Sequence, residues 1–95
     1  MIITITTSHL TPEQFRQSQD FLPGFLAKLK TVPGVINVYH YLGPDSYSRN
    51  TLVIWENEQV LQAYQVSDLV KEANTFAQSV GEQVSRAVYP LLYSD

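Results

Sequence analysis

The sequence predicts an α+β fold with the element order β-α-β-β-α-β, built around one four-stranded antiparallel sheet. Three observations support this prediction. Four segments are rich in β-branched and aromatic residues, as strands are. Two other segments carry apolar residues at helical spacing and follow the first and the third of these strands. Helices in those places act as crossovers, which gives the ferredoxin-like plan of a sheet with its helices on one face.

The first strand is expected over residues 2–7, which are all β-branched. A helix should follow, because Thr11 and Gln14 can form a capping box and Pro12 suits the first helical position. Apolar residues then form one stripe to about residue 31, and these are Phe15, Leu22, Phe25, Leu26 and Leu29. Pro23 removes a backbone hydrogen bond inside this helix, so a kink or a break is expected there.

The middle of the chain predicts two strands, over residues 35–42 and 51–55, joined by a polar connection of residues 43–50. A helical region is expected from about residue 57 to residue 78. Its apolar positions do not form one continuous stripe, and Ser67 is a good N-cap for a new helix. Two short helices are therefore predicted in place of one long helix.

The last strand is predicted from about residue 84 to residue 93, and Pro90 restricts its own position to a sheet edge or a bulge. The strands are apolar in both phases, whereas a sheet with one wet face alternates between apolar and polar residues. Because the helices cover only one face, we expect the sheet of a second copy to cover the other. The tyrosines expected in these strands and at this interface are Tyr39, Tyr41, Tyr89 and Tyr93.

Composition limits the function further. The 95 residues include six basic and nine acidic ones, and the basic residues are scattered, so no nucleic-acid partner is expected. The absence of cysteine excludes disulfides, thiolate metal sites and a cysteine nucleophile. No apolar run approaches the roughly 20 residues that span a membrane, and no signal peptide is visible, so no membrane partner is expected. We expect one domain over residues 1–95, in a cytoplasmic protein that gains burial by dimerising.

One segment carries a recognisable pattern. Residues 55–68, WENEQVLQAYQVSD, combine a strand that ends on Trp, a short acidic turn, and a helix with an aromatic residue before Ser-Asp. This pattern resembles the antibiotic biosynthesis monooxygenase family of dimeric α+β barrels, and the join at residues 33–35 is similar as well. The resemblance implies a homodimer and a cofactor-independent oxidation of an electron-rich aromatic or polyketide-like molecule in a pocket between sheet and helices. Relatives also include haem-degrading oxygenases, isomerases and decarboxylases.

The resemblance also implies where chemistry would lie. Haem-degrading relatives use a Trp and a His ligand in this helical region and an Asn on the first strand. Those positions fall here on Tyr64, Asn74, and Thr6 or Thr7. Asparagine is a poor iron ligand compared with imidazole, so haem degradation is disfavoured and no cofactor is expected. Other members often carry His where Tyr64 stands, and tyrosine with its pKa of about 10 is a reluctant base.

Seven residues are candidates for the site. Four are candidates for catalysis, namely His40, Tyr64, Asn74 and Arg86, and three for substrate binding, namely Trp55, Thr7 and Phe76. His40 shares a strand face with Ile36, Val38 and Leu42, either as a hydrogen-bonded core or interface residue or as a general base. Tyr64 and Asn74 could share one side of the helical region, where they close a pocket or bond to each other; otherwise they lie in solvent.

Arg86 interrupts an apolar strand, so its charge needs a partner. That partner could be Glu13, Asp20, Glu82 or the other subunit in a salt bridge; alternatively, Arg86 could hold a substrate oxygen or enolate. Trp55 is either a core aromatic under the helix or a stacking wall for a flat ligand. The two histidines are far apart, without a carboxylate at ligand spacing, so no metal site is expected.

Two functions therefore remain open. One is a cofactor-independent monooxygenase or related small-molecule enzyme that acts on an aromatic molecule. The other is a non-catalytic dimeric barrel that serves as a ligand sensor or an interaction module, which the missing His at Tyr64 favours.

Overall fold

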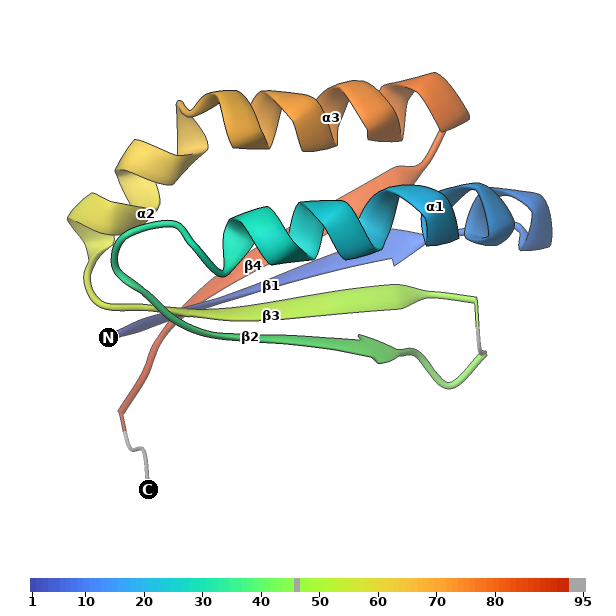
Figure 1. The fold of residues 1–95 in the computed structure, drawn as a ribbon. Helices are drawn as coiled ribbons and strands as arrows, with labels where there is room; N and C mark the ends of the chain where they lie inside the picture. Colours follow the sequence, from blue (N-terminus) through green and yellow to red (C-terminus); the bar gives the residue numbers. More distant parts are fainter. Residues whose placement is uncertain (46, 93–95) are drawn as a thin grey trace.

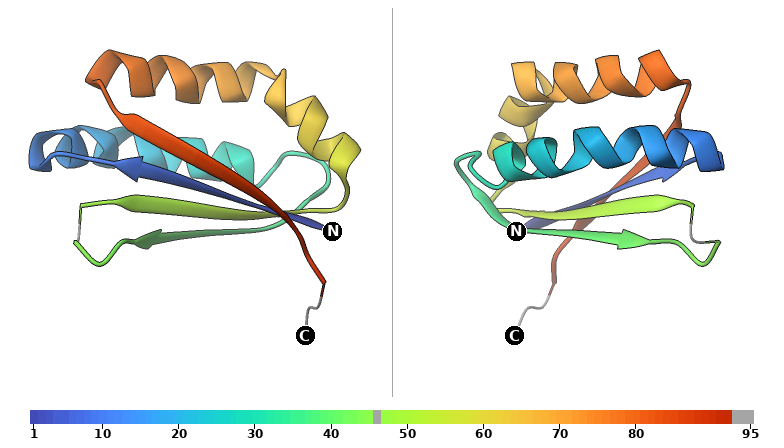
Figure 2. Two further views of the ribbon diagram at one scale, coloured as in Figure 1. Left: turned by 180° about the vertical axis from the view of Figure 1, so that it is seen from behind. Right: turned by 45° about the vertical axis from the view of Figure 1, so that its right-hand side comes forward.

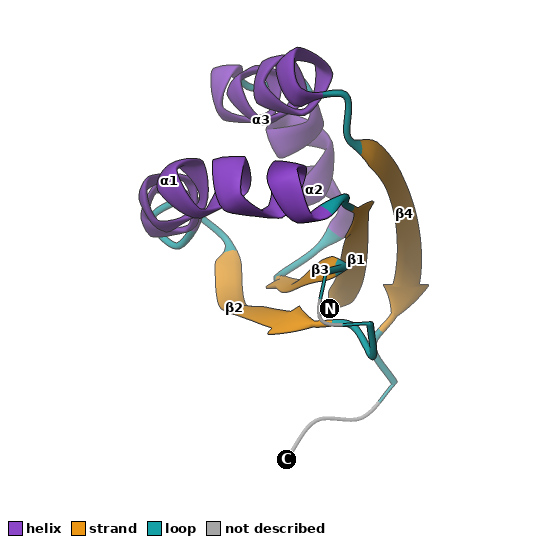
Figure 3. Ribbon diagram, turned by 90° about the vertical axis from the view of Figure 1, so that its right-hand side faces the viewer, coloured by secondary structure: helices purple, strands orange, loops and turns teal. Residues whose placement is uncertain are grey.

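The computed structural model describes residues 1–45 and 47–92, and in this part of the chain the predicted α+β order is confirmed. The four strands pair antiparallel in the order β2-β3-β1-β4. All helices lie on one face of the sheet, and the sheet curls around them so that β4 rises toward the last helix (Figures 1 and 3). The elements are β1 (Ile2–His9), α1 (Pro12–Leu29), β2 (Val35–Leu42), β3 (Arg49–Trp55), α2 (Glu58–Gln65), α3 (Asp68–Val80) and β4 (Gln83–Pro90).

Helix α1 begins as predicted and does not break at Pro23. The side chain of Thr11 accepts a hydrogen bond from the Gln14 backbone, and the Gln14 side chain accepts one from the Thr11 backbone. Of the kink or break expected at Pro23, the break is wrong, because one helix runs through Pro23 to Leu29. Pro23 and Gln19, whose carbonyl loses its partner, are both exposed, so water can replace the missing hydrogen bond.

The helical region is divided in two, as its capping residue predicts. The side chain of Ser67 accepts from the Val70 backbone and donates to the carbonyl of Tyr64, which ends α2 and starts α3. Helix α3 ends at Gly81, whose φ of 73° is in the left-handed region that glycine adopts without strain. The backbone N–H of Glu82 then donates to the carbonyl of Ala77.

Strand boundaries differ from the prediction where polar residues pair. Strand β1 extends to His9 and β3 begins at Arg49, because Ser8 pairs with Arg49 across the sheet despite its polar side chain. Strand β4 ends at Pro90, which lies on an edge strand as expected. The predicted continuation through Leu91 and Leu92 is wrong, since neither residue is in a strand, and its predicted end at Tyr93 lies outside the described residues.

The register assigns each side chain to a face. The core on the helix side contains Leu29, Val53, Trp55 and Leu61. The other face carries the alternate residues of each strand, and its large apolar members are Ile3, Ile5, Tyr39, Tyr41, Leu52, Ile54 and Tyr89. No helix of the described residues covers this face, which both views in Figure 2 show. Val38 and Leu42 share a face with His40 as expected, whereas Ile36 lies at a bulge between Val35 and Asn37 and has no pairing partner.

No helix among residues 1–45 and 47–92 has the length and apolar character that crossing a membrane requires.

Gly34 fixes the approach of α2 to the sheet and gives a test of the fold. Its φ is 87°, and a Cβ there would lie 2.5 Å from a methyl carbon of Val60 in α2. We expect Gly34→Ala to lower the free energy of unfolding by about 1–3 kcal/mol, measured by urea denaturation. Gly24→Ala is the matched control: no atom lies within 4 Å of the added Cβ, and a helical alanine should stabilise by about 0.5–1 kcal/mol. Equal effects of the two substitutions would contradict this packing.

Candidate functional site

A cleft between the sheet and helices α1 and α3 contains two adjoining cavities. The larger, of about 150 Å³, is lined mainly by apolar side chains, including Trp55 and Tyr64, and is called here the apolar chamber. The smaller, of about 90 Å³, is lined by the charged and polar groups His40, Arg49 and Glu82 and is called the polar chamber. Five residues line both chambers, namely Thr6, Phe25, Thr51, Ala73 and Arg86. A dry cavity of about 150 Å³ holds a benzene-sized ring.

One row of side chains crosses the whole sheet and forms the floor of the polar chamber. His40 pairs with Thr51, Thr51 with Thr6, and Thr6 with Arg86, so each of the four strands contributes one residue. Directly paired residues lie on the same face, and this row faces the helices. The row that includes Val38, Val53 and Val88 is apolar except for Thr4. The cleft is therefore polar along one line and apolar beside it.

Trp55 is a core aromatic, as one of the two predictions for it has it, and it also borders the cleft. It is 1% exposed and belongs to the core, and its ring also lines the apolar chamber. The indole N–H donates to the hydroxyl of Thr4 at 2.8 Å, and the Tyr64 ring lies 5.0 Å away at 41°. Burial raises the pKa of Tyr64, and the charge of Arg86 opposes this rise. Tyr64 is thus a neutral hydroxyl donor in this wall at neutral pH.

His40 is held neutral in a defined orientation. Its Nδ1 lies 3.0 Å from Thr51 Oγ1, and its Nε2 lies 3.4 Å from a guanidinium nitrogen of Arg49. Arginine can only donate, so Nε2 is the acceptor and the ring proton is on Nδ1, which donates to Thr51. Burial and, secondarily, the charge of Arg49 lower the pKa of His40. The hydroxyl proton of Thr51 is then free to point into the chambers.

Arg49 is a charged side chain that the sequence did not single out. Its guanidinium lies 3.9 Å from the centre of the Phe15 ring and donates to the Phe15 carbonyl at 3.4 Å. Its Nε is buried without a hydrogen-bond partner among the described residues. Burial lowers the pKa of Arg49, and the charge of Glu82 opposes this effect. Its positive charge is therefore only partly compensated.

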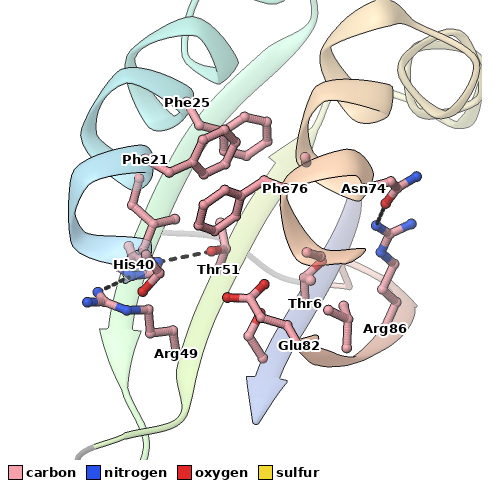
Figure 4. A pocket seen from close by; sticks show the side chains of 16 residues that line it. Thr6, Phe21, Phe25, His40, Arg49, Thr51, Asn74, Phe76, Glu82 and Arg86 are labelled. Carbon is pink, nitrogen blue, oxygen red and sulfur yellow. Dashed lines mark hydrogen bonds between the residues drawn. The ribbon is translucent and has the colours of Figure 1, made fainter. Parts of the chain in front are cut away.

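Arg86 has a neutral partner and not the expected acidic one. Its guanidinium donates to the side-chain oxygen of Asn74 at 2.9 Å, as the dashed line in Figure 4 shows. Neither Glu13, Asp20 nor Glu82 pairs with it; the ion pairs among residues 1–45 and 47–92 are Lys28–Glu72 and Lys71–Asp68. The salt bridge expected within the chain is absent because the α3 position above β4 holds an amide. Arg86 is exposed and lines the cleft with no acidic partner among the described residues.

Glu82 is the ionisable residue of the cleft that sequence reasoning considered only as a partner for Arg86. The left-handed turn at Gly81 brings Glu82 back beneath α3, where it is partly buried and lines the polar chamber (Figure 4). Burial raises the pKa of Glu82, and Arg49 opposes this rise. The signal that could have found it is the glycine cap, because the chain after such a cap turns back toward the helix.

Three phenylalanines form the roof of the polar chamber and join α1 to α3. Phe21 stacks on Phe76 with ring centres 4.2 Å apart and planes at 4°, and on Phe25 at 5.5 Å (Figure 4). Phe76, one of the predicted substrate contacts, lines the polar chamber. Thr7 does not, because its side chain is on the opposite face and donates to Asn50 at 2.8 Å. Its neighbour Thr6 takes that place on β1.

The structure thus brings six of the seven predicted residues to one cleft. Trp55 and Tyr64 line the apolar chamber, His40, Asn74 and Phe76 line the polar chamber, and Arg86 lines both. Tyr64 and Asn74 do not bond to each other, since Asn74 is bonded to Arg86. No group of three or more His, Asp or Glu in the described part of the chain could hold a metal ion.

Several solved structures share this architecture. A candidate antibiotic biosynthesis monooxygenase from Deinococcus radiodurans superimposes with a TM-score of 0.90 over 100% of this chain and 96% of its own, at 11% identity. A second candidate, from Nitrosomonas europaea, gives 0.86 over 98% and 100% at 12% identity, and a third, from Caulobacter crescentus, gives 0.84 over 97% and 90% at 14% identity. This chain has their fold. No family model and no curated protein matches the sequence.

The shared fold agrees with the resemblance seen in residues 55–68, and at such low identity it establishes architecture alone. A protein of unknown function from Nitrosomonas europaea has the same fold, with a TM-score of 0.83 over 99% of this chain and 91% of its own, at 15% identity. Function must therefore be argued from the cleft.

The state of His40 predicts a pH dependence of stability. The pKa of His40 is lower in the folded protein than its unfolded value of 6.5, because the fold favours the neutral ring. The contribution of the neutral ring to the free energy of unfolding is therefore present above pH 6.5 and is lost as the pH falls below that value. We expect His40→Gln to make the loss of stability on acidification shallower, by less than the ceiling of about 1.4 kcal/mol per pH unit for one group. Thermal melts at a series of pH values measure this. His9→Gln, at an exposed site, should retain the wild-type slope; an unchanged slope in His40→Gln would refute the assignment.

Proposed function

We propose that the chain binds a small, flat aromatic molecule that carries a hydroxyl group and oxidises it with molecular oxygen without a cofactor. One observation carries this proposal: an apolar chamber walled by Trp55 and Tyr64 adjoins a polar row that ends in the uncompensated charge of Arg86. A ring in the apolar chamber would place its hydroxyl oxygen at the row. Apolar walls with a few convergent polar groups are typical of small-molecule sites.

The chemistry requires the molecule to react as its oxygen anion. Such an anion passes one electron to O₂, and the two radicals then combine at a ring carbon. One oxygen atom of O₂ stays on the ring and the other leaves as water, so that one phenol and one O₂ give one quinone and one water. The chain would hold the anion with Arg86 and with the hydroxyl of Thr51, which His40 orients. The apolar chamber would keep water from the reacting carbon.

A second candidate is a non-catalytic ligand sensor with the same binding cleft. It is favoured by the state of His40, whose Nε2 lone pair faces Arg49 and is not free to accept a substrate proton. It is also favoured by Tyr64, whose raised pKa keeps the hydroxyl protonated at neutral pH, so that it cannot act as the base. The two functions require the same ligand and differ in whether oxygen is consumed.

The outer face of the sheet supports the proposal that the partner of this chain is a second copy of itself. It carries isoleucines and leucine in the central strands, with tyrosines on the flanking strands, of which Tyr39 is 50% and Tyr89 is 51% exposed. A contiguous apolar face of this kind marks an interaction surface, and an identical sheet matches its shape and composition.

Trp55 is the only tryptophan of the chain and reports on the cleft directly. We expect 1-naphthol to quench its fluorescence saturably in the wild-type protein. Ala73 lines both chambers, so Ala73→Leu should fill them and weaken binding at least about tenfold. Ala27→Leu makes the same change at an exposed position of α1 and should bind like the wild type. Equal binding by the two variants would show that the ligand does not occupy the cleft.

The same complex separates the two functions. An oxygen electrode should record one O₂ consumed for each quinone formed from 1-naphthol by the wild-type protein. Ala73→Leu should lose this turnover in proportion to its loss of binding, while Ala27→Leu should retain it. Saturable quenching without any oxygen consumption would favour the sensor.

The dimer is tested at the centre of the outer face. Ile5 lies in β1, between two neighbouring strands, and points away from the helices. A lysine there would bury a charge in the interface, so Ile5→Lys should raise the dimer dissociation constant at least about a hundredfold in analytical ultracentrifugation. Val66→Lys, at a 76% exposed position between α2 and α3, should leave it unchanged. A monomeric wild-type protein would exclude the dimer.

A further inference from the structure

The polar chamber contains an acidic group that the proposed function has not used. The titratable and charged groups that line the polar chamber with Glu82 are His40 from β2, Arg49 from β3 and Arg86 from β4. Helices α1 and α3 and strand β1 contribute no titratable side chain to this lining, and Tyr64 of α2 lies in the adjoining chamber. With His40 neutral, two positive charges face one carboxylate.

The carboxylate of Glu82 is unusual in having no fixed partner. Among residues 1–45 and 47–92 it makes no hydrogen bond and no ion pair, although it is partly buried. Burial raises its pKa, so its charged form is disfavoured by the fold. Figure 4 shows the carboxylate directed into the middle of the lining, between the His40–Thr51 pair and the side of Arg86. An unpartnered acid that faces a cleft is a candidate for proton transfer.

We propose that Glu82 takes the proton from the hydroxyl group of the bound aromatic molecule, and that Arg86 holds the resulting oxygen anion. This inference rests on the proposed binding of a phenol-like molecule in the cleft. The O–H bond breaks, its electron pair stays on the ligand oxygen, and the proton bonds to a carboxylate oxygen of Glu82. The negative charge moves from the carboxylate to the ligand, so the chamber keeps two positive charges and one negative charge throughout.

The other groups of the cleft are less suited to this step. The Nδ1 proton of His40 points to Thr51 and its Nε2 faces Arg49, so neither nitrogen can accept from a ligand as arranged. Tyr64 is protonated, and its raised pKa keeps it so. Arg49 and Arg86 only donate. Glu82 is therefore the acceptor that the described lining provides.

The test uses p-nitrophenol, which is colourless when neutral and yellow as the phenolate. Quenching of Trp55 reports binding regardless of the ligand's protonation state, and visible absorbance reports the proton. About one pH unit below the pKa of the free phenol, the wild-type complex should be yellow. Calorimetry in two buffers of different ionisation enthalpy should then detect no net proton release, because Glu82 retains the proton.

Glu82→Gln keeps the shape of the side chain and removes the acceptor. This variant should bind with an affinity within about threefold of the wild type but give a colourless complex at that pH. Colour should appear only at higher pH and with release of one proton to the buffer. Glu56→Gln, at an exposed position with no ion pair among the described residues, should behave like the wild type. Thermal melts confirm that each variant is folded.

Three outcomes overturn the inference. A yellow complex of Glu82→Gln without proton release would show that another group accepts the proton. A colourless wild-type complex would show that no transfer occurs in the cleft. The absence of Trp55 quenching in the wild-type protein would refute the proposed binding function and the inference with it, whereas the first two outcomes leave the binding function intact.

Discussion

The register of the four strands is the constraint on which the cleft depends. Because each strand pairs antiparallel with its neighbour, four residues far apart in sequence become one row: His40, Thr51, Thr6 and Arg86. A slip of one residue in any strand would turn its side chain to the opposite face and break the row. Trp55 helps to fix this register, since its indole bonds to Thr4 of the next strand and its ring is fully buried. The packing of the core and the geometry of the site are therefore consequences of the same pairing.

The helices complete the cleft without filling it. Phe21 and Phe76 stack face to face, which holds α1 and α3 together above the sheet. Beneath them, the shared wall of the two chambers is made largely of small side chains, including Thr6, Thr51 and Ala73. Large aromatic side chains that bridge two helices over small residues leave space that close packing would otherwise remove. The cavity therefore exists because large side chains join the two helices while small side chains line the space between the helices and the sheet.

The sequence predicted those parts of the structure that depend on neighbours in the chain. The capping residues Thr11 and Ser67 placed two helix starts correctly, and the apolar pattern gave the order of strands and helices along the chain. Pairing across the sheet could not be predicted in the same way, because Thr6 and Thr7 differ only in the face that the register gives them. The partner of Arg86 and the place of Glu82 likewise depend on how α3 lies over β4. Composition and spacing contain no information on that approach.

The polar row lowers the stability that the inner face of the sheet can contribute, and this affects how the outer face is interpreted. Its four residues are polar side chains on the helix-facing side of the sheet, from the exposed Arg86 on one edge strand to the half-buried His40 on the other, where apolar side chains would normally form the core. The fully buried apolar residues of the described chain are only Leu29, Val53, Trp55, Leu61 and Val70. Because a small chain buries a smaller fraction of its surface than a large one, further burial of apolar surface would stabilise these 95 residues. The outer face, by contrast, carries large apolar side chains. Ile5 is one of them: it is next to Thr6 in sequence and lies on the opposite side of the sheet. Pairing of two outer faces would bury these side chains and would stiffen the same strands that hold the row, so the proposed dimer would also support the proposed site.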